Sequence, residues 1–156
     1  MAAGVAGIAA AGCASSGDPE GGGATATKAA GDDTAPDVAV ATTALGAIRS
    51  LERAVAATLT KYPATSSSLR EVLAMHRAHA AALVDAVPDQ AQASADPTPY
   101  AVPRSRDRAL VVLARREQGL HDSLGGLAMR AQSGDFARLL ASMGSAVGQR
   151  LALWAT

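Results

Sequence analysis

Large apolar side chains recur three or four residues apart in four separate stretches of the chain, all after Pro36. A residue advances by about 100 degrees on an α-helix, so this spacing gathers the apolar side chains on one face. A helix with one apolar face must bury it against a neighbour. Four such stretches without a strand pattern predict an all-α protein, an antiparallel four-helix bundle. The expected helices are Asp37 to Tyr62, Ser68 to Pro88, Pro103 or Arg104 to Gln132, and Asp135 to Trp154.

Turn and capping residues separate these stretches. Pro63 ends the first helix, and Ser68 and Glu71 have the spacing of a capping box at the start of the second. Gly125-Gly126 is expected to weaken or bend the third helix. Two short turns and one long link over residues 88–103, which contains several prolines, predict two tight hairpins joined by a crossover. This is the ferritin-like topology; the alternative is a plain bundle with a long middle loop.

Charge and length limit the classes of function. The chain has 156 residues, enough for one domain and an unstructured segment, and it carries 14 basic and 14 acidic side chains with no block of like charge. Nucleic acid is not expected as a partner, because phosphate binding needs clustered basic residues. No apolar run approaches the roughly 20 residues of a membrane-spanning helix. Attachment to a membrane would have to use another device.

The sole cysteine, Cys13, follows Ala10-Ala11-Gly12 and a short apolar stretch. This arrangement resembles the lipobox of bacterial lipoproteins, which implies that residues 1–12 are a signal peptide and that Cys13 carries a lipid. The resemblance places the protein outside the cytoplasm, anchored to the outer face of the cell membrane. A start codon further upstream would account for the lack of a basic residue before Cys13. The alternative is a free cysteine in a leader rich in Ala and Gly.

Residues 13–36 read as a flexible tether. They are mainly Gly, Ala, Ser, Thr and Asp, and such a segment cannot bury enough surface to offset its ordering entropy. The domain that it would hold, residues 37–156, has no cysteine and therefore no disulfide. Its stability must come from the packing of its helices.

Several ionisable side chains lie within or beside the apolar faces. They are Glu52 in the first helix, His76 and His79 in the second, Glu117 and His121 in the third, and Arg150 in the fourth. A charged group at such a position is costly unless it is paired, so these residues are expected to meet one another or water.

These features together resemble a ferritin-like lipoprotein of actinobacteria. In ferritin-like di-iron proteins, inward Glu residues and Glu-x-x-His pairs bind two metals. On that pattern Glu52 and Glu117 match the carboxylates of the first and third helices. The motif is not intact: the second helix offers His76-Arg77-Ala78-His79, with Glu71 facing away, and the fourth offers Gln149-Arg150. An arginine in this layer can replace the metal as the counter-charge of the carboxylates.

Three interpretations follow for the inward polar residues. The first, which we prefer, is a structural core network of Glu52, His76, Glu117 and Arg150 that fixes the register of the helices. The second is a site for a single divalent metal such as zinc, with Glu52, His76, His79, Glu117 and His121 as candidate ligands, since His-x-x-His on one helix face is a plausible ligand pair. The third is an apolar ligand cavity between helices, or an exposed helix face for docking.

No residue is singled out as catalytic. The serines at 66–68 have no nearby histidine in the sequence and no nucleophile-elbow glycines. Tyr100, the one aromatic residue of the long link, is expected to cover the end of the bundle. The expected function is a non-catalytic binding or scaffolding module without a cofactor, with a cell-envelope protein or a second copy of the chain as partner. A metal-binding protein is the alternative.

Overall fold

A computed structural model describes residues 34–87 and 99–154. The four helices are confirmed, and the described residues contain no strand. Cys13 and residues 13–33 of the predicted tether lie outside the described part, whereas residues 34–36, also assigned to the tether, form the start of α1. The helices are α1 (Thr34–Lys61), α2 (Ser66–Ala86), α3 (Arg106–Ala128) and α4 (Gly134–Trp154), with a short 3-10 helix at Pro63–Thr65.

The starts of the helices differ from expectation where a local motif competes with the fold. Ser68 lies inside α2 and does not cap it; the N-cap position is Thr65, which makes no capping hydrogen bond through its side chain. The 3-10 turn before α2 already carries the chain into helical geometry. In α3, by contrast, the Oγ of Ser105 accepts a hydrogen bond from the N–H of Arg108. Pro36 lies in the first turn of α1, where the missing N–H costs no hydrogen bond.

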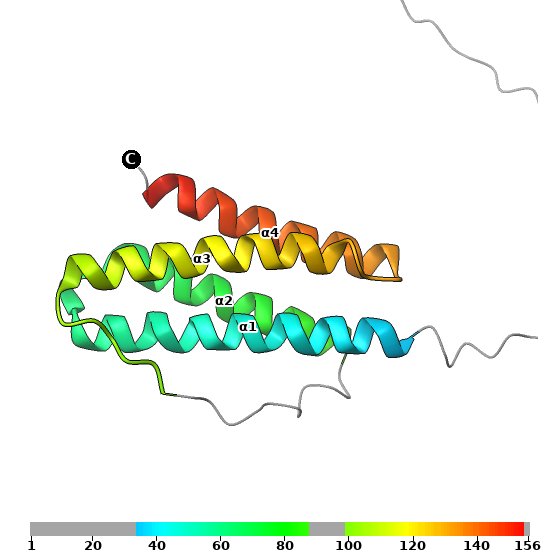
Figure 1. The fold of residues 1–156 in the computed structure, drawn as a ribbon, viewed down its shortest axis with the longest axis horizontal. Helices are drawn as coiled ribbons and strands as arrows, with labels where there is room; N and C mark the ends of the chain where they lie inside the picture. Colours follow the sequence, from blue (N-terminus) through cyan, green and yellow to red (C-terminus); the bar gives the residue numbers. More distant parts are fainter. Residues whose placement is uncertain (1–33, 88–98, 155–156) are drawn as a thin grey trace, which may run out of the picture.

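The helices form two antiparallel hairpins, α1 with α2 and α3 with α4, and α1 also packs against α3 (Figure 1). The start of α3 lies beside the end of α1, because Nζ of Lys61 and the hydroxyl of Tyr62 donate to the carbonyls of Val102 and Pro103 at 3.1 and 2.8 Å. The chain therefore runs up, down, down and up along the bundle. In this view α4 diverges from α3 toward its C-terminal end.

The core follows the apolar faces read from the sequence. Its largest fully buried apolar side chains come from all four helices: Ile48, Val55, Leu69, Val72, Leu83, Leu113, Leu124, Leu127, Leu140 and Val147. Residues at the ends of the predicted faces, such as Leu59, Leu110 and Leu151, are half-buried and pack against this core. Gly125-Gly126 does not interrupt α3.

The end of the bundle where α1 begins is held by a buried carboxylate. Asp37 accepts hydrogen bonds from the backbone N–H groups of Gln132 and Ser133, at 2.7 and 2.9 Å. These two N–H groups precede α4, where no carbonyl of the same helix can reach them. Asp37 thus attaches the first helix to the turn between α3 and α4. None of the described helices is long and apolar enough to cross a membrane.

Candidate functional site

The centre of the bundle contains one buried ionisable pair. Nε2 of His76 on α2 and Oε1 of Glu117 on α3 are 2.8 Å apart, and the side chains are 0% and 3% exposed. Their backbones belong to the two helices that lie diagonally opposite, so this hydrogen bond crosses the middle of the bundle. With a hydrogen on Nε2, the imidazole of His76 donates this hydrogen bond and Oε1 of Glu117 accepts it. The pair satisfies two groups that would each be costly if buried alone.

His79 lies one turn beyond His76, with the two rings edge to face and their centroids 6.4 Å apart. Burial lowers the pKa of His79 below its ordinary value of 6.5, and the neighbouring His76 lowers it further. The native environment thus favours neutral His79. The Nδ1 atoms of both rings are buried without a hydrogen-bond partner. Two unpartnered ring nitrogens on successive turns of α2 are an unusual feature of the interior.

The structure does not assemble the expected network of four residues. Glu52 is half-buried and pairs with the exposed Arg77, with Nε and Oε1 3.1 Å apart. Arg150 pairs with Glu71, which is exposed as expected. Both Glu52 and Arg150 stand at the edges of their apolar faces, and their long side chains reach partners at the surface of the bundle. Only His76 and Glu117 of the four meet in the core.

His121 serves a contact between α3 and α4. Its Nδ1 donates to the carbonyl of Gly144 at 2.8 Å. The ring lies against Gly148, where an added Cβ would stand 3.1 Å from the imidazole. Small residues on α4 thus let the ring pack against that helix. Among residues 34–87 and 99–154, no three His, Cys, Asp or Glu side chains are grouped closely enough to hold a metal ion. The five candidate ligands are therefore not gathered at one point.

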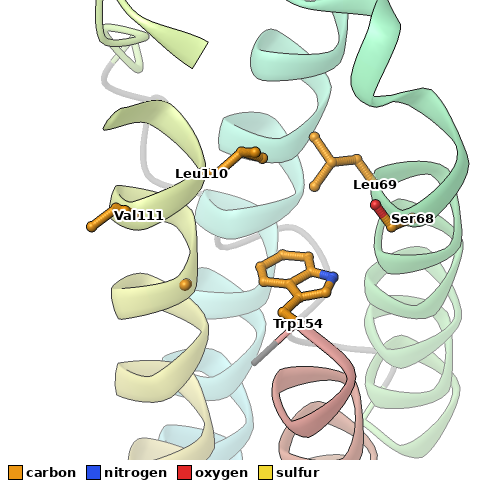
Figure 2. A pocket seen from close by; sticks show the side chains of 6 residues that line it. Ser68, Leu69, Leu110, Val111 and Trp154 are labelled. Carbon is orange, nitrogen blue, oxygen red and sulfur yellow. The ribbon is translucent and has the colours of Figure 1, made fainter. Parts of the chain in front are cut away.

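An apolar pocket of about 310 Å³ opens at the end of the bundle where α2 and α3 begin. Trp154, the last residue of α4, spans the space between α2 and α3, with Leu69 and Leu110 above its indole (Figure 2). The residues that line the pocket are Ser68, Leu69, Leu110, Val111, Ala114 and Trp154. The apolar faces in the sequence are compatible with a ligand cavity between helices, but they do not indicate which residues would line it. The sequence feature that indicates this pocket is Trp154, a large aromatic residue at the end of the apolar face of α4.

Trp154 also lines a second, narrow void, whose lining includes Glu117 and Arg150 and which leaves no room for a water molecule. Trp154 is therefore shared between the lining of the apolar pocket and that of the void beside Glu117. Tyr100, at the same end, packs against the core as expected, with the guanidinium of Arg116 5.1 Å from the centre of its ring.

Comparison with known protein families, curated proteins and solved structures gives no match. The resemblance to ferritin-like lipoproteins of actinobacteria therefore stays a prediction from the sequence.

Proposed function

We propose that this protein is a lipid-anchored, extracytoplasmic helical bundle that works as a non-catalytic binding module. The observation that carries this proposal is the open apolar pocket around Trp154. Pockets of this kind between helices, lined by apolar and aromatic side chains, are common sites for small ligands. The buried carboxylates of Asp37 and Glu117 support a non-catalytic role, because each makes hydrogen bonds that hold helices together.

The anchor is supported by the sequence before α1. Cys13 follows the small residues Ala10-Ala11-Gly12, and 20 residues separate it from Thr34. Their composition suits a tether between a lipidated cysteine and a folded domain. A second copy of the chain or a cell-envelope protein remains the expected macromolecular partner.

The anchor is tested by expressing Cys13→Ala in bacterial cells that process lipoproteins. Wild-type protein should fractionate with membranes, gain the mass of a lipid and be digested by protease added to intact cells. Cys13→Ala should lose both the lipid and the membrane association. A conservative change outside the lipobox, Ser16→Ala, is the matched control and should behave as wild type. A Cys13→Ala protein that stays with the membrane would contradict the anchor, and protection from protease would contradict the location.

A metal-binding function is the second candidate, favoured by the two unpartnered Nδ1 atoms of His76 and His79. Its test is thermal unfolding of the full chain carrying Cys13→Ala, which removes the thiol as a competing ligand, during titration with zinc, manganese or iron. If a metal binds the native state, stability rises with its concentration, by about 2.7 kcal/mol at 100 times Kd. The rise should disappear in His79→Ala. An unchanged melting temperature would count against this function.

A further inference from the structure

We propose that the pocket around Trp154 binds a single-chain anionic amphiphile, with the apolar tail in the pocket and the anionic head among the arginines at this end of the bundle. The proposal deepens the binding function above and rests on it. It concerns a free molecule, not the surface of a membrane. Three features of the structure lead to it: the lining of the pocket, its size and the charge around it.

The lining selects an apolar tail. Leu69 and Leu110 face the indole of Trp154 across the pocket, and Ser68 is the only residue of the lining with a polar side chain apart from the indole N–H. Each methylene group that leaves water for such a site strengthens binding about fourfold. A polar or charged group placed here would lose its hydration without gaining partners.

The size selects a single chain. The volume of about 310 Å³ is at the lower end of the range for small-molecule pockets. A slender unbranched tail fits such a space, whereas a lipid with two long chains would leave much of its apolar surface in water. The pocket is partly open to solvent, so the head of a bound molecule can stay in water.

The charge at this end selects an anionic head. Over residues 61–71 and 99–116, basic side chains outnumber acidic ones: Lys61, Arg70, Arg104, Arg106, Arg108, Arg115 and Arg116 stand against Glu71 and Asp107. Both acids already have arginine partners, Glu71 in Arg150 and Asp107 in Arg106. Basic side chains therefore remain in excess at this end of the bundle, although Lys61 donates to Val102 and Arg116 donates to Ser50. This excess favours an anion over a cation here.

Two of these arginines stand close to the pocket along α3. Arg108 and Arg115 are exposed and lie three residues before and four residues after Val111, which lines the pocket. Residues at these spacings share one face of a helix. These two guanidinium groups are the ones that we expect to pair with a carboxylate or phosphate head at the mouth of the pocket.

The test uses Trp154 as its reporter, because it is the only tryptophan of the chain. The full chain carrying Cys13→Ala is titrated with sodium decanoate below its micelle concentration while tryptophan fluorescence is recorded. We expect the fluorescence to change saturably, with one binding site. The affinity should rise about fourfold for each methylene added from hexanoate to octanoate. Decyltrimethylammonium, with the opposite charge and a tail of the same length, should bind more weakly.

Two sets of variants test the apolar pocket and the nearby positive charge separately. Ala114→Phe and Ser68→Phe each fill the pocket and should abolish the change in fluorescence, with helical content measured by circular dichroism to exclude unfolding. Arg115→Glu should weaken decanoate binding about fivefold at low salt, because it exchanges an attraction for a repulsion. Arg130→Glu, at the other end of the bundle, changes the net charge equally and should leave the affinity unchanged.

Several outcomes would overturn the proposal. They are no saturable response to decanoate, equal affinity for the cationic amphiphile, or equal effects of Arg115→Glu and Arg130→Glu. Binding to vesicles of anionic phospholipid without binding of monomeric decanoate would identify a membrane-facing surface instead. Binding of neutral decanol without decanoate would keep the binding function and reject the anionic ligand. None of these results depends on Cys13, so failure of the anchor is detected separately.

Discussion

Replacing Glu117 by leucine should destabilise the bundle strongly, whereas replacing Glu117 and His76 together should not. The single change leaves a fully buried imidazole whose Nε2–H has lost its acceptor at 2.8 Å. The converse change, His76→Leu, leaves a buried carboxylate without its donor. Leucine at both positions fills a similar volume and leaves no polar group behind. A buried pair replaced in this way is often neutral or stabilising.

The magnitude follows from the burial of the two side chains. The lost hydrogen bond to a charged group contributes about 1.5–3 kcal/mol, and the stranded buried group costs about 1–3 kcal/mol more. Together these costs span about 2.5–6 kcal/mol. We expect each single variant to lose about 3–5 kcal/mol, the usual cost of breaking a buried pair. A domain is stable by about 5–15 kcal/mol in total, so this is a large fraction. The double variant should stay within about 1 kcal/mol of the parent.

The assay is urea unfolding at neutral pH, followed by far-ultraviolet circular dichroism, in the full chain carrying Cys13→Ala. The four proteins form a double-mutant cycle, and their free energies of unfolding are comparable if the dependence on urea is the same for all. Losses below about 1 kcal/mol in both single variants, or losses that simply add in the double variant, would contradict a coupled buried pair. A single variant more stable than the parent would indicate that the pair is kept for a ligand.

Three further predictions concern stability. Asp37→Ala removes two hydrogen bonds of 2.7 and 2.9 Å to backbone N–H groups and should cost about 2–4 kcal/mol in thermal unfolding, with faster amide exchange at the turn before α4; slow exchange there would contradict the attachment. Gly126→Ala should stabilise the protein by up to about 1 kcal/mol, because a Cβ at this helical position meets nothing within 4 Å. Gly148→Ala should stabilise it less, because the new Cβ would stand 3.1 Å from the ring of His121. The native state lowers the pKa of His79 below 6.5, so the stability that this residue contributes is present above pH 6.5 and is lost as the pH falls through its native pKa. The melting temperature should therefore fall on acidification, and it should fall less steeply in His79→Gln. Equal pH dependence of the melting temperature in the two proteins would refute this assignment.

The helices and their buried faces could be predicted from the sequence because both depend on local spacing. Ile48, Leu113 and Leu140 occupy the centres of their apolar faces, and each is fully buried. Glu117 was also assigned to the interior correctly, since it stands four residues after Leu113 and three before Leu120. Periodicity decides such positions whatever the neighbouring helix is.

The ends of helices and the edges of their faces were predicted less well. The capping box assigned to Ser68 and Glu71 was wrong, because α2 begins earlier, after a 3-10 turn that the sequence did not reveal. Glu52 and Arg150 lie where an apolar face meets the surface, and there the position of a partner decides the outcome. Arg77 and Glu71, both exposed on α2, draw these side chains outward.

The sequence by itself determined four amphipathic helices and most of the side chains that must be buried, because the 3.6-residue period acts within one helix. The tertiary structure alone decided which of those side chains meet. It pairs His76 with Glu117 across 41 residues of sequence, turns His121 toward the carbonyl of Gly144, and ends α4 so that Trp154 closes one side of an apolar pocket. These contacts depend on how the helices are placed against each other, and helix placement is a property of the whole core rather than of any local pattern.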